Sequence, residues 1–328
     1  MGYLQNESIY RDRYRILRKL GEGGSSEVYM AVDVRTGAPV TVKIIKENAF
    51  VVRKASEIVK EETKVLKYVS HPMIPEVLAV YDDAFVLEYV PGNSLAKVLK
   101  KQGRFPEKTA VAIGFELLDM LGNLHELRWP VIYRDLKPSN IMLRPDGHVS
   151  LIDFGAARII RQMGAADTLN LGTEGFAAPE QYGSLGQTDP RTDIYCFGRT
   201  MLQLLGGKCS PELMEVIDKC TRPDREDRFE SCSQIVAALK KYPARRIRNR
   251  VLKVAQVVFA SAAAAAVISF TAAHYNAAMS YAAEDARVRV PAVKERLGSA
   301  GYRIKEILKE KIDVDVDELI SPVEEEDR

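Results

Sequence analysis

The chain has few cysteines, and no two of them are spaced as a metal-binding or redox pair. Cys196, Cys209, Cys220 and Cys232 are the only four among 328 residues, and each is more than ten positions from the next. This spacing fits neither a zinc-ligand motif nor a dense disulfide framework. We therefore expect four reduced thiols, largely buried, in a globular protein.

The chain also lacks a large excess of charge of either sign. Lys and Arg number 47 against 45 Asp and Glu, which gives a formal net charge of +2. No global basic field exists to attract nucleic acid, so we predict no nucleic-acid partner. Hydrophobic residues make up 46% and charged residues 28%, which is ordinary globular composition. The length is sufficient for about two structural units.

Charged side chains are missing from one long stretch, residues 254–283. Its first twenty residues, 254–273, are mostly Ala and Val with two Phe. A helix of this length spans about 30 Å, which matches the hydrocarbon core of a membrane. The basic residues immediately before it are Arg245, Arg246, Arg248, Arg250 and Lys253. Length and flanking charge together predict a single transmembrane helix.

The basic flank also predicts an orientation. The positive-inside rule places residues 1–253 in the cytoplasm and the short tail, 274–328, outside it. We expect a basic juxtamembrane segment at 243–253 and a tail that is too short to hold a core of its own without disulfides. The tail could sense a signal, dimerise or simply hang in solvent. The alternative is a soluble alanine-rich helix, with the tail as a cytosolic interaction module.

A glycine-rich turn follows the first predicted strand, residues 14–20. It reads Gly-Glu-Gly-Gly-Ser-Ser-Glu-Val over residues 21–28. Glycines at such a turn let backbone N–H groups approach a polyphosphate without interference from side chains. This signal is weak by itself, because glycine-rich hairpins are common.

A lysine and a glutamate form a candidate buried ion pair. Lys43 lies in a β-branched run, 39–45, which we predict to be a strand. The next segment, 52–69, has apolar residues at helical spacing, and Glu62 shares its inward stripe with Ile58 and Leu66. A carboxylate on that face requires a cation, and Lys43 is the candidate.

The strongest signal is a series of motifs in a fixed order. Residues 131–142 contain Tyr-Arg-Asp-Leu-Lys-Pro-Ser-Asn, Asp-Phe-Gly follows at 153–155, and Ala-Pro-Glu at 178–180. With the glycine-rich turn and the Lys43–Glu62 pair, the chain resembles the protein kinases, specifically the eukaryotic-like serine/threonine kinases of bacteria. The resemblance covers residues 14–242 and leaves 1–13 as an N-terminal segment.

The resemblance implies a bilobal α+β fold. An N-terminal lobe would hold an antiparallel sheet and the C-helix, and a mainly helical C-terminal lobe would follow. One departure stands out. Only 206–210 separate the expected F-helix, 192–205, from 211–220, which reads like the H-helix. We therefore predict that the G-helix is shortened or absent. In the family, this helix is a common docking surface for substrates and partners.

Catalytic roles follow from the resemblance. Asp135 would accept the proton of the substrate hydroxyl, and Lys137 would steady the γ-phosphate, as in serine/threonine kinases. Asn140 and Asp153 would hold Mg²⁺, or Mn²⁺ in its place. Tyr133 replaces the commoner His of this loop. Residues implied to bind ATP are Leu20, Gly21, Glu22, Gly23, Gly24, Ser25, Ser26, Val28, Lys43, Glu62, Leu87, Glu88 and Val90, with Leu87 as gatekeeper.

The segment between Phe154 and Pro179 is expected to be the activation loop. Arg134 would pair with a phosphorylated residue there. Thr168 is our first candidate for that phosphosite. Thr173 is the second, although its position indicates contact with the catalytic Asp and Lys. The resemblance further implies that Asp193 begins the buried F-helix. It also implies a structural pair between Glu180 and Arg228.

These features predict a membrane-anchored serine/threonine protein kinase. It would transfer the γ-phosphate of MgATP to protein substrates and would also phosphorylate its own activation loop. A homodimer would allow one copy to phosphorylate the other in trans. Two alternatives remain at this point. One is a nucleotide-binding pseudokinase scaffold, against which the full ionic set argues. The other is a small-molecule kinase, against which Lys137, the Ala-Pro-Glu segment and the Asp193 and Arg228 positions argue.

Overall fold

The computed structural model describes residues 8–46, 54–160, 173–182 and 188–242, together with Ala264 and Ser269. The chain divides into two units, Met1–Tyr242 and Pro243–Arg328, and only the first is described at length. The predicted membrane helix at 254–273 falls outside these ranges except for those two residues. Within the described ranges, every helix is too short or too polar to cross a membrane.

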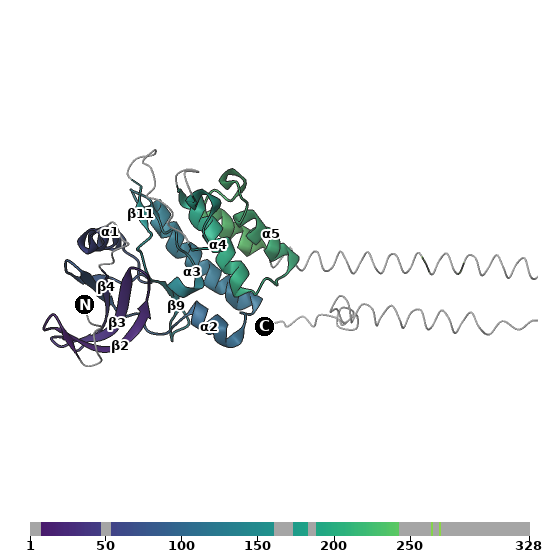
Figure 1. Ribbon diagram of the computed structural model, residues 1–328. Helices are drawn as coiled ribbons and strands as arrows, with labels where there is room; N and C mark the ends of the chain where they lie inside the picture. The colour runs from purple at the N-terminus through teal and green to yellow at the C-terminus, as the bar shows by residue number, and fades with distance from the viewer. Residues whose placement is uncertain are drawn as a thin grey trace, which may run out of the picture. The chain divides into compact units, whose positions relative to one another are not determined.

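The N-terminal lobe is built on a six-stranded antiparallel sheet (Figure 1). Its spatial order is β1-β2-β3-β4-β6-β5. The strands are β1 (Ile9–Tyr10), β2 (Tyr14–Glu22), β3 (Ser26–Asp33), β4 (Pro39–Ile45), β5 (Val77–Val80) and β6 (Ala84–Glu88). Buried and partly buried residues alternate along β3, as expected for a strand with one face turned to a core. Strand β2 is longer than predicted, because it continues into the glycine-rich turn.

Helix α1 (Ala55–Tyr68) packs against β4, β5 and β6 and closes one face of this sheet. Its buried positions include Val59, Glu62 and Leu66, so the inward stripe predicted from the sequence is confirmed. Glu62 is thus held inside the lobe although it carries a charge. The opposite face of the sheet holds a separate apolar cluster, which is formed by Tyr14, Ile16, Tyr29, Ala31, Val40, Val42 and Val86.

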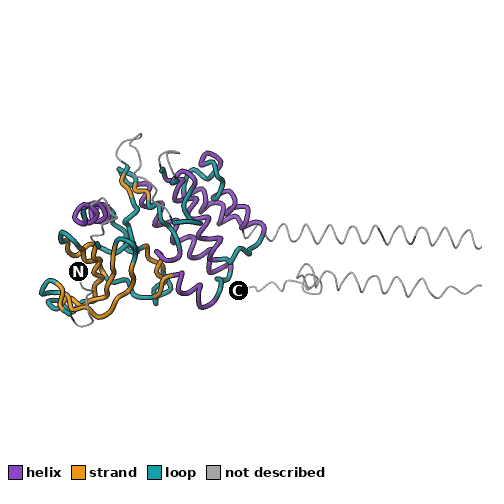
Figure 2. The backbone as a smooth tube through the Cα atoms, viewed as in Figure 1, coloured by secondary structure: helices purple, strands orange, loops and turns teal. Residues whose placement is uncertain are grey.

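The C-terminal lobe is mainly helical (Figure 2). Its helices are α2 (Leu95–Gln102), α3 (Glu107–Glu126), α4 (Pro190–Leu204), α5 (Pro211–Cys220) and a helical segment at 232–242. Three 3₁₀ turns join them, η1 (Pro138–Asn140), η2 (Pro179–Gln181) and η3 (Arg225–Asp227). Short strands form two small sheets, β10-β9-β7 and β11-β8, from β7 (Asn93–Ser94), β8 (Val131–Ile132), β9 (Ile141–Leu143), β10 (Val149–Leu151) and β11 (Arg158–Ile159).

Helix α4 begins where its sequence signals a start. Asp189 accepts a hydrogen bond from the Arg191 backbone N–H at 2.8 Å, and Pro190 occupies the first helical position. The helix ends at Leu204, and residues 205–210 contain no helix before α5 begins at Pro211. The predicted loss of the helix between these two elements is therefore confirmed.

The cysteines are free thiols, as predicted. Three of them are buried, and Cys209 is half-buried. Burial raises the pKa of Cys232 to about 12, so this thiol stays protonated near neutral pH.

Candidate active site

A cavity of about 420 Å³ lies between the glycine-rich turn, β6 with the segment after it, and η1. This volume is in the range of small-molecule sites. Within the turn, the Gly23 N–H donates to the Ser26 carbonyl at 2.8 Å. Of the predicted nucleotide-binding residues, those that line the cavity are Leu20, Gly21, Glu22, Gly23, Ser26, Val28, Lys43, Glu62, Leu87, Glu88 and Val90. Gly24 and Ser25 belong to the same turn but are not among the lining residues.

Sequence reasoning missed several lining residues. They are Arg18, Thr41, Pro75, Tyr89, Gly92, Asn93, Ser94, Lys97, Ser139, Met142 and Ile152. Thr41 could have been found, because it lies two residues before Lys43 and so faces the same side of β4. Gly92 has φ of +117°, and a Cβ there would lie 2.0 Å from the Leu143 carbonyl oxygen. Only glycine therefore fits at this point of the wall.

Lys43 joins two carboxylates from different elements. Its Nζ lies 2.7 and 2.9 Å from the two Glu62 carboxylate oxygens and 2.7 Å from Asp153 Oδ1. Burial lowers the pKa of Lys43, but Glu62 and Asp153 outweigh it and hold that pKa above its usual value. Burial raises the pKa of Asp153, and Lys43 more than compensates, so the pKa is lowered and the carboxylate stays charged. The predicted Lys43–Glu62 pair is confirmed, and Asp153 is part of it.

Phe154, the residue after Asp153, points into the core. It is 1% exposed, and its ring meets that of Tyr133 edge to face, with centroids 5.0 Å apart. The Tyr133 hydroxyl donates to the Ile152 carbonyl at 2.5 Å. Tyr133 thus contacts the residues on both sides of Asp153 and holds this segment in place, which gives a physical reason for tyrosine at this position.

Asp135 is surrounded by three polar partners. Its Oδ1 accepts a hydrogen bond from the Thr173 hydroxyl at 2.7 Å, and its Oδ2 accepts one from the Asn140 side-chain amide at 2.8 Å. Lys137 Nζ lies 2.7 Å from Asp135 Oδ2 and donates to the Thr173 hydroxyl at 2.5 Å. The predicted contact of Thr173 with the catalytic Asp and Lys is therefore confirmed. Thr168, the other phosphosite candidate, lies outside the described residues.

The loop before Asp135 is held by Asp193, from the first turn of α4. Asp193 accepts hydrogen bonds from the backbone N–H groups of Tyr133 at 2.8 Å and Arg134 at 2.7 Å. His125 Nε2 contacts the same carboxylate at 2.8 Å. Arg134 and Asp153 both have positive φ, 66° and 65°. Such backbone costs about 1–3 kcal/mol per residue and persists only where surrounding contacts impose it.

Gln181 also supports this loop, and sequence reasoning missed it. Its side-chain Nε2 donates to the Arg134 carbonyl at 2.9 Å, while its Oε1 accepts from the Ala178 N–H at 2.9 Å. The residue directly follows Ala-Pro-Glu, but an amide in a turn carries no chemical signal of this role. Gln181 therefore ties η2 to the catalytic loop.

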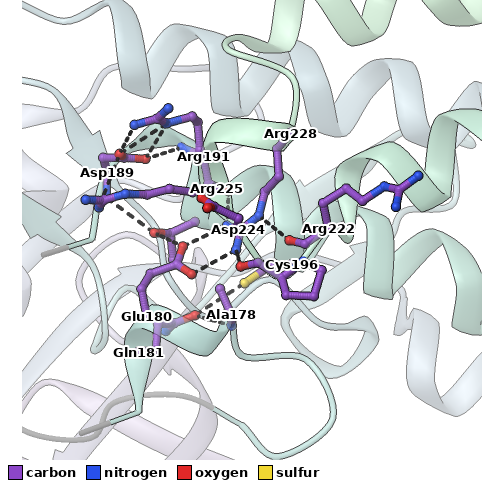
Figure 3. Close-up of polar contacts among 12 residues, drawn as sticks. Ala178, Glu180, Gln181, Asp189, Arg191, Cys196, Arg222, Asp224, Arg225 and Arg228 are labelled. Carbon is purple, nitrogen blue, oxygen red and sulfur yellow. Dashed lines mark hydrogen bonds and ion pairs between the residues drawn. The ribbon is translucent and has the colours of Figure 1, made fainter. Parts of the chain in front are cut away.

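Glu180 and Arg228 form the predicted structural pair (Figure 3). Two parallel hydrogen bonds of 2.7 and 2.9 Å join them, and Arg228 is 3% exposed. Arg228 also donates to the carbonyls of Arg191, Arg222 and Pro223. Burial raises the pKa of Glu180, but the Arg228 guanidinium outweighs it and lowers that pKa below its usual value. The pair fastens η2 to the segment before the helix at 232–242.

The donor set fits a nucleotide with a divalent cation. Asn140 and Asp153 line the same cavity and offer the oxygen ligands that Mg²⁺ prefers. Two protein ligands are sufficient for Mg²⁺ when substrate phosphates supply others. Elsewhere in the described ranges, no group of three or more His, Cys, Asp or Glu side chains could hold a metal ion.

Comparisons with known proteins agree with this geometry. The model of the protein kinase domain family matches residues 14–212. A probable serine/threonine-protein kinase, pknA2 of Bifidobacterium longum, is 32% identical over 204 residues, which are 60% of this chain and 27% of that protein. A probable serine/threonine-protein kinase of Clostridium perfringens is 34% identical over 208 residues, 61% of this chain and 29% of its own length.

Serine/threonine-protein kinase B of Synechocystis is 32% identical over 266 residues, 75% of this chain and 46% of that protein. The chain thus spans less than half the length of these relatives. The match of the family model covers more than half of this chain, from the glycine-rich strand to the start of α5. These relatives are all named serine/threonine-protein kinases, and the chain belongs to the protein kinase family.

Proposed function

We propose that this protein transfers the γ-phosphate of ATP to serine and threonine hydroxyls of proteins. One observation carries the proposal: the Thr173 hydroxyl lies within hydrogen-bond distance of both Asp135 and Lys137. An aliphatic hydroxyl can therefore occupy the position in which a carboxylate accepts its proton while a lysine contacts its oxygen. A substrate hydroxyl would replace that of Thr173 during transfer.

The residues divide the chemistry between them. Asp135 would orient the acceptor hydroxyl and take its proton as the oxygen bonds to the γ-phosphorus and the bond to ADP breaks. Lys137 would stabilise the charge on the transferred group, and Lys43, held by Glu62, would position the other phosphates. Mg²⁺ held by Asn140 and Asp153 would neutralise phosphate charge.

The decisive experiment follows transfer of labelled γ-phosphate by the full-length protein with Mg²⁺, beside Asp135→Asn. We expect label on threonine or serine in the wild type and a loss of about 10²-fold or more in the variant, with ATP binding retained. Asp119→Asn is the matched control, because that carboxylate is exposed and contacts only His71 among described side chains. If the wild type binds ATP but labels neither itself nor a peptide, the pseudokinase alternative replaces this proposal.

Two further parts of the proposal concern the whole chain. The helix expected at 254–273 would anchor the protein in the cell membrane as a single span, with the kinase domain in the cytoplasm and 274–328 outside. Thr168 would be phosphorylated in trans by a second copy and would then pair with Arg134. The uncharged length of the span and its basic flank support the first part. The position of Thr168 in the expected activation loop supports the second.

A further inference from the structure

Helix α2 carries a row of positive charge that has no acidic partner among the residues that the structure describes. Lys97, Lys100 and Lys101 share one face of the helix, because residues three and four apart are neighbours, and Arg104 lies just past its end. We call these four residues the basic stripe. All four are exposed, and none forms an ion pair with another described residue. Like charges at such spacings repel one another.

The acidic residues closest to the stripe in sequence are engaged elsewhere. Glu107 accepts hydrogen bonds from Ser210 and from the Tyr242 hydroxyl, all at 2.8 to 2.9 Å. The Glu88 carboxylate accepts one from the Glu76 N–H. No Asp or Glu occurs between Glu88 and Glu107. Within the described part of the chain, the charge of the stripe is therefore not neutralised and can meet acidic groups on a molecule that binds from solution.

One end of the stripe reaches the active site. Lys97 lines the nucleotide cavity together with Ser139 and Asn140. Helix α2 packs against η1, which holds Asn140 beside Asp135, and it lies next to β9 in Figure 1. The Ser94 hydroxyl caps α2 by accepting a hydrogen bond from the Lys97 N–H at 3.3 Å. This cap holds Lys97, the first residue of the stripe, in the first turn of the helix.

The other end reaches the short connection between α4 and α5. The Phe105 N–H donates to the Leu204 carbonyl at 2.8 Å, and a Cβ at Gly206 would lie 3.3 Å from the Arg104 Cβ. Lys208 follows two residues later and is exposed. Because 205–210 contain no helix, the α4–α5 connection adds no helix over this positive surface, which runs from the catalytic loop to that connection.

We propose that the basic stripe selects acceptor segments that carry Asp or Glu close to the phosphorylated hydroxyl. This inference rests on the proposed kinase function and names its substrate class. A segment that places its hydroxyl at Asp135 must lie across the surface next to η1, and the stripe begins there. Acidic side chains on that segment would gain charge complementarity, whereas Arg or Lys on it would be repelled.

The test compares three peptides with the same central threonine as their only hydroxyl acceptor, flanked by Glu, by Ala and Gln, or by Arg. The full-length protein should phosphorylate the acidic peptide with kcat/KM about tenfold above the neutral one and the basic peptide least, since several exposed charge pairs act together. The preference should shrink at 1 M salt, where the screening length falls to about 3 Å.

The variant Lys100→Glu/Lys101→Glu/Arg104→Glu should reverse the order of the acidic and basic peptides while the neutral peptide is phosphorylated as before. None of these three residues lines the nucleotide cavity. The matched control is Lys60→Glu/Lys64→Glu/Lys67→Glu on α1, which changes the same number of exposed charges and should keep the wild-type order. The two variants change the net charge equally, so a difference between them shows that the stripe itself contacts the peptide.

The outcomes distinguish the inference from the function on which it rests. If the wild type phosphorylates all three peptides equally, the substrate class is wrong and the kinase function stands. If it phosphorylates none, the kinase function itself fails. If the stripe variant keeps the peptide order but loses binding to vesicles of anionic phospholipid, the stripe is a lipid contact and the inference is overturned.

Discussion

At the scale of single residues, the pair of Glu180 and Arg228 shows how a buried charge is kept. The guanidinium meets the carboxylate with two hydrogen bonds and also serves three backbone carbonyls. Removing one partner of a buried ion pair costs about 3–5 kcal/mol, because the other charge is left without compensation. We therefore expect Arg228→Met to lower the free energy of unfolding by about that amount at pH 7, as measured by urea denaturation.

Arg191→Met is the matched control in the same region (Figure 3). Arg191 pairs with Asp189 and Glu226, but its side chain is 22% exposed and Glu226 is 69% exposed. Exposed ion pairs contribute about 1 kcal/mol or less, so this variant should remain close to the wild type. Equal losses in the two variants would show that Arg228 has no special structural role.

The lowered pKa of Glu180 adds a dependence on pH. A carboxyl whose folded pKa lies below its unfolded value, here 4.5, stabilises the fold above that value and loses the contribution as the pH falls through the folded pKa. The free energy of unfolding of the wild type should exceed that of Glu180→Gln at pH 7. The difference should shrink as the pH is lowered from 4.5 to 3, and a constant difference would contradict the assignment.

Much of the site was predictable at this scale because its chemistry needs particular residue types in a fixed order. Lys43 with Glu62, Thr173 with Asp135, and Glu180 with Arg228 were expected and are found in contact. Gln181 and Met142 were not expected, because an amide or an apolar side chain acquires its role only from what the fold places beside it.

At the scale of elements, hydrophobic spacing predicted helix α1 well, whereas the strand before the glycine-rich turn was predicted too short. The period of apolar residues set the inward face of α1. The resemblance placed the F-helix at 192–205, and α4 begins two residues earlier, at Pro190, where Asp189 caps it. β2 continues through Gly21 to Glu22, because pairing with β3 continues that far, to Glu27 opposite Glu22. Strand pairing is a long-range contact that local sequence does not contain.

The packing of α4 on α5 gives a prediction for a single methyl group. A Cβ at Gly198 would lie 2.6 Å from Thr221 Cγ2 and 2.8 Å from Cys220 Cβ, so Gly198→Ala must push the two helices apart. We expect a loss of about 1–3 kcal/mol in the free energy of unfolding, as is usual for overpacking. The measurement is chemical denaturation of the full-length protein.

Gly122→Ala in α3 serves as the control. Its Cβ would lie 3.7 Å from Cys232 Cβ, an ordinary contact, and alanine is the better helix former by about 1 kcal/mol. This variant should be as stable as the wild type or more stable. If Gly198→Ala is equally harmless, the close approach of α4 and α5 is not required for the fold.

At the scale of the whole molecule, the kinase domain and the uncharged segment follow different physical rules. Residues up to Tyr242 form one unit whose core and ion pairs explain its fold. The stretch 254–273 is uncharged and alanine-rich with only four polar residues, so its sequence lacks the charged face that marks a surface helix of a soluble lobe. That difference in pattern supports the proposal of a membrane span at 254–273.

The proposed membrane anchor can be tested by placing charge at the centre of residues 254–273. Each Asp at the middle of a membrane helix costs about 2.5–3.5 kcal/mol on insertion scales, and a run rich in alanine has little hydrophobicity in reserve. We expect the full-length protein to stay with membranes after an alkaline wash and Ala263→Asp/Val267→Asp to be released. Ala263→Leu/Val267→Leu should remain bound, because it alters the same positions without charge. If the wild type is released as readily as the Asp variant, the alanine-rich segment is a soluble helix, and the tail is then a cytosolic interaction module.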